Sequence, residues 1–210
     1  MKKLIAALGF SAAVLGWAGA ANAFTIEDHL RVKVGVSGVL PDEDADVEVL
    51  GGSVDVSDEY VPSLQLEWMF TDNISAELLC CVATHDVEHS AGIDLGEVSH
   101  FPPTVTVKYR FNTDGMMQPY VGAGVNWTKF YDTEPPSSGP VTSISYDDSF
   151  GPALQLGLDI MTDEHWFVNL DVRKIWINTD VTLEATGVGT LHADVDIDPI
   201  VASASVGYRF

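Results

Sequence analysis

The stretch Ile200-Val-Ala-Ser-Ala-Ser-Val-Gly-Tyr-Arg-Phe210 alternates between two kinds of residue. Its even positions are apolar, and its odd positions from Ser203 to Arg209 are small or charged. A period of two is typical of a β-strand with one apolar and one polar face. If the apolar face meets lipid, both strand edges must be paired, because open edges do not occur inside a bilayer. The stretch therefore predicts one strand of a closed transmembrane barrel.

Seven earlier segments repeat this alternation, and the connections between segments alternate between short and long. The segments are 29–39, 61–70, 74–85, 103–111, 119–130, 149–161 and 165–181. Short turns are expected near 71–73, 112–118 and 162–164, and long loops over 40–60, 86–102, 131–148 and 182–199. This pattern predicts an all-β fold, an eight-stranded antiparallel up-and-down transmembrane β-barrel with both chain ends on the short-turn side.

A soluble lipocalin-like barrel is the alternative, with its apolar face turned inward. Two observations oppose it. The charged residues of the strands would then occupy the core, where burial is costly. Aromatic residues also gather near strand ends, as a membrane girdle requires. They are Trp68, Phe70, Tyr109, Phe111, Trp127, Trp166, Tyr208 and Phe210.

The amino-terminal segment has the composition of an export signal. Lys2 and Lys3 precede an apolar stretch over 4–18, and Ala21-Asn-Ala23 provides a small-residue cleavage site. The apolar stretch is short for a membrane anchor, which is the alternative interpretation. We therefore expect residues 1–23 to be a secretory signal peptide that is removed, leaving an outer-membrane barrel domain over 24–210.

The charge of the chain excludes one class of partner. Residues 1–23 contain two of the 10 basic residues and no acid, so eight basic residues remain against 31 acidic ones. Such a surface repels nucleic acid, and we expect no nucleic-acid partner.

Much of the acidic surplus lies in the expected loops, as in Asp42-Glu43-Asp44-Ala-Asp46 and Asp194-Val-Asp196-Ile-Asp198. Neither run has the twelve-residue pattern of a calcium loop, so solvated charge is the preferred interpretation. His85, His89 and His100 lie near the second loop, but their spacing is not that of a metal site. We expect no metal and no cofactor.

Inward positions near the short turns are charged on most strands. The expected charged ring comprises Arg31, Lys33, Glu67, Glu77, Lys108, Arg110, Asp159, Asp171, Arg173 and Arg209. Side chains can fill a barrel this narrow, and unpaired burial is costly, so we expect a paired plug. A water-filled ion pathway is one alternative. Acid–base catalysis is another, but no nucleophile lies among these residues, so we expect no catalytic residue and no enzyme.

Farther from the short turns the inward positions become apolar. Leu79, Cys81 and Ile175 form the expected apolar constriction, which would accept a small hydrophobic molecule. Ordinary packing of a narrow barrel is the alternative.

Prolines near the long-loop ends of four strands suggest an exit through the wall. Each removes a donor from the β-ladder, so a lateral gap for a hydrophobic solute could lie there. The alternative is that they simply begin strands. They are Pro62, Pro103, Pro152 and Pro199.

Several of these strands resemble one known family. Phe101-Pro-Pro-Thr-Val-Thr-Val-Lys-Tyr-Arg-Phe111 and Pro119-Tyr-Val-Gly-Ala-Gly-Val-Asn-Trp-Thr-Lys-Phe130 are similar to the OmpW family of outer-membrane proteins. The similarity continues through Ser149-Phe-Gly-Pro-Ala-Leu-Gln-Leu-Gly-Leu-Asp159 and Trp166-Phe-Val-Asn-Leu-Asp171 to Gly207-Tyr-Arg-Phe210. It covers essentially the whole chain after residue 23.

This resemblance implies a narrow, largely apolar channel for small hydrophobic compounds. Leu79 matches an inward apolar position of the family, whereas Arg173 departs from an apolar constriction. The resemblance also implies that the terminal aromatic residues, Tyr208 and Phe210, are the signal that the barrel-assembly machinery reads.

The expected function is a non-enzymatic channel for small hydrophobic molecules in the bacterial outer membrane, with a charged short-turn end and a lateral exit. Its expected partners are outer-membrane lipid, the barrel-assembly machinery and small hydrophobic solutes. Two alternatives are a structural or surface-interaction barrel with acidic loops and a narrow cation-selective pore. A lipid-modifying enzyme is a third, which would need a pair such as serine with His85, His89 or His165.

Overall fold

The computed structural model describes residues 29–42, 44–47, 54–80, 83–89, 93–134, 141–187 and 189–210. The regular elements assigned within these ranges are strands. No helix in the described ranges is long and apolar enough to cross a membrane.

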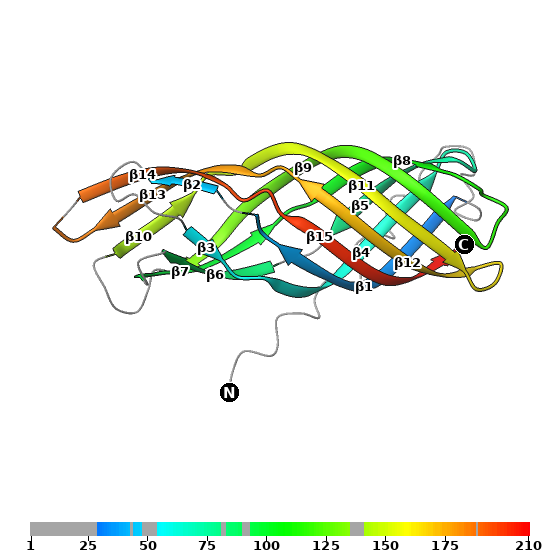
Figure 1. Ribbon diagram of the computed structural model, residues 1–210, viewed down its shortest axis with the longest axis horizontal. Coiled ribbons are helices and arrows are strands. Elements are labelled where there is room, and N and C mark those ends of the chain that lie inside the picture. The colour runs from blue at the N-terminus through cyan, green and yellow to red at the C-terminus, as the bar shows by residue number, and fades with distance from the viewer. Residues whose placement is uncertain are drawn as a thin grey trace, which may run out of the picture.

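Eight of the strands form a closed antiparallel barrel (Figure 1). They are β1 (Leu30–Leu40), β4 (Glu59–Met69), β5 (Ile74–Cys80), β8 (Thr104–Arg110), β9 (Met117–Glu134), β11 (Ser149–Met161), β12 (Trp166–Ile175) and β15 (Ile200–Arg209). Their order is β11-β12-β15-β1-β4-β5-β8-β9, and a pairing between β9 and β11 completes the ring. The predicted eight-stranded up-and-down barrel is confirmed.

The outer surface of the barrel is apolar and the inner surface polar along much of each strand. On β8, Val105, Val107 and Tyr109 are exposed, whereas Lys108 and Arg110 are buried. A soluble barrel has the opposite arrangement. The exposed apolar side chains therefore form the band that faces lipid.

Aromatic side chains pair with one another near the short turns. Tyr208 makes edge-to-face contacts with Trp166 and Phe210, each with ring centroids 4.9 Å apart. His29 stacks on Trp68 at 5.5 Å. Rings of this kind prefer the headgroup region, so this end of the barrel lies at a membrane interface.

Seven further strands occupy the long-loop end, where the sequence predicted loops. They are β2 (Asp44–Val47), β3 (Val54–Val56), β6 (Ala83–His89), β7 (Ile93–Phe101), β10 (Val141–Tyr146), β13 (Asn178–Ala185) and β14 (Gly189–Asp196). The prediction that these four segments are long loops was therefore wrong, because they contain strands. Figure 1 shows these strands extending the barrel away from the short turns.

The extension has two parts. β10, β13, β14 and β2 form a separate four-stranded sheet, whereas β3, β6 and β7 join the barrel sheet next to β9. The predicted strand 165–181 is divided between β12 and β13, and the predicted strand 74–85 ends at Cys80 as β5, with β6 beginning at Ala83. Ile144, Val181 and Val195 form the apolar face of the separate sheet, which explains why it folds despite its many acidic residues.

Candidate functional site

Charged side chains fill the barrel interior toward the short turns. Nine of the ten residues predicted for the charged ring are exposed by 4% or less, and we call these nine the charged layer. They are Arg31, Lys33, Glu67, Glu77, Lys108, Arg110, Asp159, Asp171 and Arg173. The tenth, Arg209, is half-buried at the short-turn mouth.

Glu77 is one of two carboxylates in the charged layer that have three basic partners; Glu67 is the other. It forms ion pairs with Lys33, Lys108 and Arg173, and the distance to Lys108 Nζ is 2.8 Å. Gln155 Nε2 donates a further hydrogen bond to its Oε1 atom, also at 2.8 Å. These partners come from four different strands, so Glu77 ties opposite walls of the barrel together.

Glu67 lies directly opposite Glu77 in the register of β4 and β5. Its Oε1 accepts from Arg110 Nη2 at 2.8 Å and from Ser75 Oγ at 2.6 Å, and it lies 3.2 Å from Lys108 Nζ. Asp159 Oδ2 also accepts from Arg110 at 2.8 Å. Arg110 therefore bridges two carboxylates that belong to β4 and β11.

Tyr120 stands in the middle of the network. Its hydroxyl donates to Asp171 at 2.8 Å and accepts from Asn169 Nδ2 at 2.8 Å, while Lys108 Nζ lies 3.8 Å from the ring centroid. A Cβ atom at Gly157 would overlap this ring, so glycine at that position makes room for it.

Two participants in this network, Tyr120 and Gln155, were not among the predicted site residues. Gln155 donates to both Glu77 and Asp171, and Tyr120 is completely buried. Both occupy inward positions in the alternation of their strands, whereas the predicted ring comprised formally charged residues. A large aromatic residue at an inward position next to Gly122 was the signal that could have identified Tyr120.

The free energy of burying the charged layer depends on whether each charged group has partners. Moving a charge into a medium of low dielectric costs several kcal/mol unless partners and hydrogen bonds compensate. Each of the four carboxylates here has at least two donor groups within ion-pair or hydrogen-bond distance. The arrangement closes the interior with paired side chains, and the geometry contains no nucleophile placed for catalysis among the described residues.

Apolar side chains occupy the interior on the long-loop side of the charged layer. We call this cluster the apolar layer, and it comprises Val39, Val61, Ala153, Ile175, Ile177 and Val201. Phe130 and Ile197 pack against it from the strands beyond. A cavity of about 10 Å³ lies at the edge of this layer toward the long loops, lined in part by Val39, Phe130 and Ile177. That volume is near the roughly 10–15 Å³ needed for one water, so the layer is closed.

The residues of the predicted apolar constriction lie in different surroundings. Ile175 belongs to the apolar layer. Leu79 is buried, but its neighbours in strand register are Gln65 and Thr104, so it lies at the boundary with polar groups. Cys81 lies outside the described residues.

The β-ladder continues across the prolines at the long-loop ends. The pairing of β11 with β9 runs without interruption from Ser149 to Ile160 and includes Pro152 opposite Val125. The Pro152 carbonyl accepts from the Trp176 amide at 3.1 Å, and the Pro199 carbonyl accepts from the Ile175 amide at 3.1 Å. In each case the proline carbonyl is used while the ring nitrogen has no proton to donate.

Among the residues that the structure describes, no group of three or more histidine, cysteine, aspartate or glutamate side chains could hold a metal ion. His100 is buried beside the apolar layer, with its ring 6.0 Å from that of Phe130. The side chains of His85 and His89 lie outside the described parts of the chain.

Comparison with known proteins gives a consistent assignment. A family model described as OmpW family matches residues 27–210. Outer membrane protein W of Vibrio cholerae serotype O1 is 35% identical over 196 residues, covering 88% of this chain and 89% of the relative. The dibenzothiophene metabolism operon protein PahQ of Pseudomonas aeruginosa is 28% identical over 193 residues, covering 88% and 90%.

The fold comparison agrees with the sequence comparison. The crystal structure of the outer membrane protein OprG from Pseudomonas aeruginosa is similar with a TM-score of 0.81 and 29% identity, covering 88% of this chain and 96% of OprG. The resemblance inferred from the strand motifs is confirmed. The chain belongs to the OmpW family and is a β-barrel protein of the bacterial outer membrane.

Proposed function

We propose that this barrel is a non-enzymatic channel that admits small hydrophobic molecules from the outside. The observation that carries the proposal is the division of one narrow interior into the apolar layer, toward the outside, and the charged layer beneath it. In barrels of this class the short turns face the periplasm, so the charged layer forms the periplasmic floor.

The two layers differ in what can displace them. The apolar layer is held by dispersion and the hydrophobic effect, which are not directional, so an apolar solute can replace the contacts that it breaks. The charged layer is held by directional ion pairs, and a solute that offers no charge cannot replace these. A hydrophobic molecule can therefore enter the apolar layer but is stopped at Arg173 and Glu77.

The same contrast argues against a cation-selective pore. Ion conduction requires a water-filled path with binding that is weak enough for release. Here Lys33, Glu67 and Glu77 have side chains that are 0% exposed, and Lys33 forms an ion pair with each glutamate. The name of PahQ associates that relative with dibenzothiophene metabolism, and dibenzothiophene is a fused apolar aromatic compound. This supports an apolar aromatic solute for the present chain.

Because the floor is closed, we propose that the solute leaves sideways between β11 and β12. Pro152 supplies no amide donor there, and the register of these strands begins at Ala153 opposite Ile175. Beyond that point, β12 ends and the chain continues as β13 in the separate sheet. To let a solute pass between β11 and β12, fewer backbone hydrogen bonds must therefore break at this position than nearer the short turns.

Uptake of a small aromatic compound by a deletion strain carrying the gene tests the channel proposal. The protein should accelerate uptake severalfold over the empty strain, whereas a purely structural barrel would leave it unchanged. In a planar bilayer the refolded protein should pass little ionic current, and Leu79→Ala should be leakier. A large ohmic, cation-selective current in both proteins would overturn the proposal.

Cross-linking tests the lateral exit separately. With Cys80 and Cys81 replaced by serine, Leu154→Cys with Lys174→Cys places two thiols directly opposite each other near Pro152. Closing this pair should abolish uptake. The matched control joins Leu158→Cys to Leu170→Cys, which lie four residue pairs nearer the periplasm on the same two strands. This cross-link should leave uptake intact. Uptake that survives both cross-links would exclude this exit while retaining the channel.

Export and assembly complete the proposal. We propose that residues 1–23 are cleaved as a signal peptide and that Tyr208 and Phe210 are read by the barrel-assembly machinery. The Phe210 amide donates to the Leu30 carbonyl at 3.1 Å, next to the β1–β15 closure. Phe210→Ala should slow assembly of the barrel, measured by the heat-modifiable gel shift of newly made protein.

A further inference from the structure

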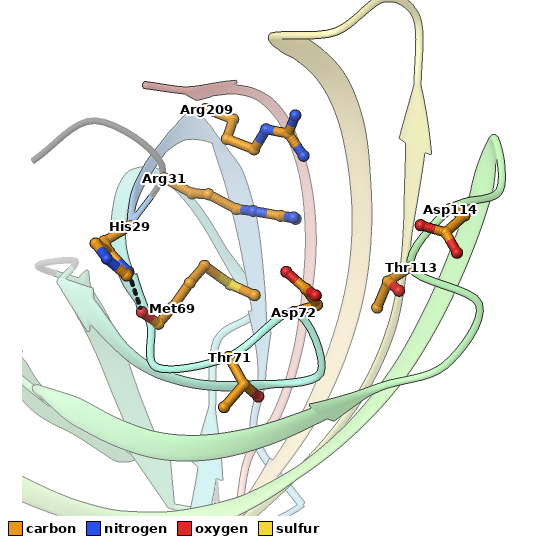
Figure 2. Close-up of a pocket in the computed structure, with 8 residues that line it drawn as sticks. All are labelled: His29, Arg31, Met69, Thr71, Asp72, Thr113, Asp114 and Arg209. Atoms are coloured by element: carbon orange, nitrogen blue, oxygen red, sulfur yellow. Dashed lines mark hydrogen bonds between the residues drawn. The ribbon is translucent and has the colours of Figure 1, made fainter.

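The periplasmic mouth of the barrel contains a cavity that the proposed channel does not use. Its volume is about 270 Å³, far above the roughly 15 Å³ that one water needs. Figure 2 shows Arg31 and Arg209 on one side and the two turns that carry Asp72 and Asp114 on the other. We call it the periplasmic cavity. The residues that line it are His29, Arg31, Met69, Thr71, Asp72, Thr113, Asp114 and Arg209.

Arg31 and Arg209 are directly opposite each other in the register of β1 and β15. Both side chains extend into the periplasmic cavity (Figure 2). Like charges at directly opposed positions destabilise a strand pair. The arrangement is therefore unfavourable unless something negative lies between the two guanidinium groups.

Arg31 is only 4% exposed, and its guanidinium group lies over the Phe167 ring, with Cζ 5.5 Å from the ring centroid. Its Nη1 atom lies 3.3 Å from Asp159 Oδ2, but Arg110 binds the same oxygen more closely, at 2.8 Å. Its Nε atom has no hydrogen-bond partner among the described residues. Leaving a buried charged donor without an acceptor is costly, so the structure indicates an acceptor in the cavity.

The charge balance of the interior leads to the same place. Adding Arg209 to the charged layer gives six basic side chains against four acidic ones, and Asp72 and Asp114 at the mouth bring the acids to six. Lys33, Lys108 and Arg173 all pair with Glu77 in the charged layer. Neither mouth acid forms an ion pair with Arg31 or Arg209 within the described ranges, so the guanidinium group of Arg209 has no direct acidic partner there.

We infer that Arg31 and Arg209 form a binding site for a small oxyanion, a carboxylate or a phosphate, that enters from the periplasm. Two guanidinium groups on neighbouring strands offer donors in the fork geometry that suits oxyanions. The hydroxyl group of Thr113, which also lines the cavity, can provide a further donor at the rim. The site lies on the periplasmic side of the charged layer and does not depend on hydrophobic uptake.

Asp72 and Asp114 limit the ligand to low charge. Both carboxylates are exposed at the rim, and neither forms an ion pair with Arg31 or Arg209 within 4.0 Å. Their field is screened by salt over about 8–10 Å, yet it still opposes entry of a highly charged anion. An anion with one or two charges is therefore favoured over a polyanion.

Nuclear magnetic resonance of the arginine side chains tests the site directly, because the chain has only Arg31, Arg110, Arg173 and Arg209. The mature protein, labelled with ¹⁵N in zwitterionic micelles, is titrated with inorganic phosphate and then with acetate. The Nε–H signals of Arg31 and Arg209 should move saturably, and those of Arg110 and Arg173 should not. Equal, non-saturable shifts of all four signals would mean ionic strength alone and would overturn the inference.

Two variants separate recognition from net charge. Arg209→Gln should weaken phosphate binding at least tenfold, while Arg209→Lys, which keeps the charge without the fork, should have an intermediate affinity. Lys129→Gln is the matched control, because it removes one positive charge from an exposed side chain paired with Asp148 at the far end of the barrel. Equal loss of affinity in Arg209→Gln and Lys129→Gln would contradict the site.

The source of the oxyanion is distinguished in lipid nanodiscs. If phosphatidylglycerol discs shift the Arg31 and Arg209 signals without added phosphate, the ligand is a lipid headgroup. If added phosphate is needed in both phosphatidylglycerol and phosphatidylcholine discs, the ligand is a free oxyanion. Either result supports the site, whereas unshifted signals in every disc, with and without phosphate, would refute it.

Discussion

The charged layer and the apolar layer occupy the same inner wall but are stabilised by different forces. On β12, Asp171 and Arg173 belong to the charged layer, and Ile175 follows at the next inward position in the apolar layer. The backbone is continuous and the alternation is unchanged. A change of side-chain chemistry within two residues therefore separates a layer held by ion pairs from a layer held by apolar contacts.

In the proposed function, this contrast closes a narrow barrel to ions while it admits an apolar solute. Opening the charged layer would expose several charges that lose directional partners together. Opening the apolar layer costs dispersion contacts that a hydrophobic solute restores. Variants in the two layers should therefore differ in their effects on stability, hydrophobic uptake and ionic current.

The largest effect is expected for Glu77→Ala in the charged layer. It leaves Lys33, Lys108 and Arg173 without their shared carboxylate, so the free energy of unfolding should fall by about 3–5 kcal/mol. Urea unfolding in lipid vesicles, followed by tryptophan fluorescence, measures it. Glu184→Ala, an exposed acid on β13, should change stability by less than about 0.5 kcal/mol. A loss below about 1 kcal/mol for Glu77→Ala would show that the layer is not a cooperative network.

The second effect is expected in the apolar layer. Ile175→Ala removes buried methyl groups, and the free energy of unfolding should fall by about 2–3 kcal/mol, near the lower end of the range for such truncations. Hydrophobic uptake should rise because the layer becomes looser, while ionic current should stay low because the charged layer is intact. If Ile175→Ala raises the ionic current as much as Glu77→Ala does in the same bilayer assay, the two layers are not separate barriers.

A third variant tests the packing at the centre of the charged layer. Gly157→Ala places a methyl group against the Tyr120 ring, and this overpacking should cost about 1–3 kcal/mol in unfolding. In the comparison variant, Gly122→Ala, the new methyl group would lie 3.0 Å from Gln155 Oε1 and 3.2 Å from Lys108 Cγ, a tight contact without the overlap met at Gly157, so the loss should be smaller. Equal stability of the two variants would show that Tyr120 is free to move.

The smallest effect concerns the charged surface of the extension, where like charges are exposed and can be titrated. Asp180 lies opposite Asp194 in the register of β13 and β14. A hydrogen bond with the Asp194 carboxyl group and the negative charge of that residue raise the pKa of Asp180. Because the folded pKa lies above the unfolded value of about 3.9, the folded sheet binds the proton more tightly.

The stability of this sheet should therefore fall as the pH rises from the unfolded pKa through the folded one. Hydrogen-exchange protection factors of β13 and β14 amides should be higher below this window than above it. Asp180→Asn should remove most of the pH dependence while leaving the barrel strands unchanged. If the protection factors of the parent protein do not depend on pH, the interaction between Asp180 and Asp194 does not contribute to the stability of this sheet.

Much of the barrel could be predicted because a lipid-facing strand has an unambiguous pattern. The range Ser149–Met161 agrees with the prediction for that strand, and the other barrel strands differ mainly at their long-loop ends. The strands of the extension were missed because their segments are rich in acidic residues and were interpreted as solvated loops. The pairing of β10 with β13 joins residues distant in sequence, such as Tyr146 and Val181, which no local pattern identifies.

The candidate site was predicted as a set of residues but not as a network. Alternation alone showed that Glu77 and Arg173 point inward. That they pair, across 96 positions of sequence, depends on the closure of the barrel. Tyr120 and Gln155 were missed because neutral groups carry no charge signal in a sequence, although buried hydrogen bonds give them a central place.

The sequence by itself determined which residues face lipid and which face the interior, because a strand turns successive side chains to opposite sides. It also determined that the inner wall changes from charged to apolar along the strands. Only the tertiary structure decided which inward residues meet, because the pairing of β9 with β11 and of β15 with β1 sets the relative height of every strand. That register brings Arg31 opposite Arg209 and places Glu77 among its three basic partners.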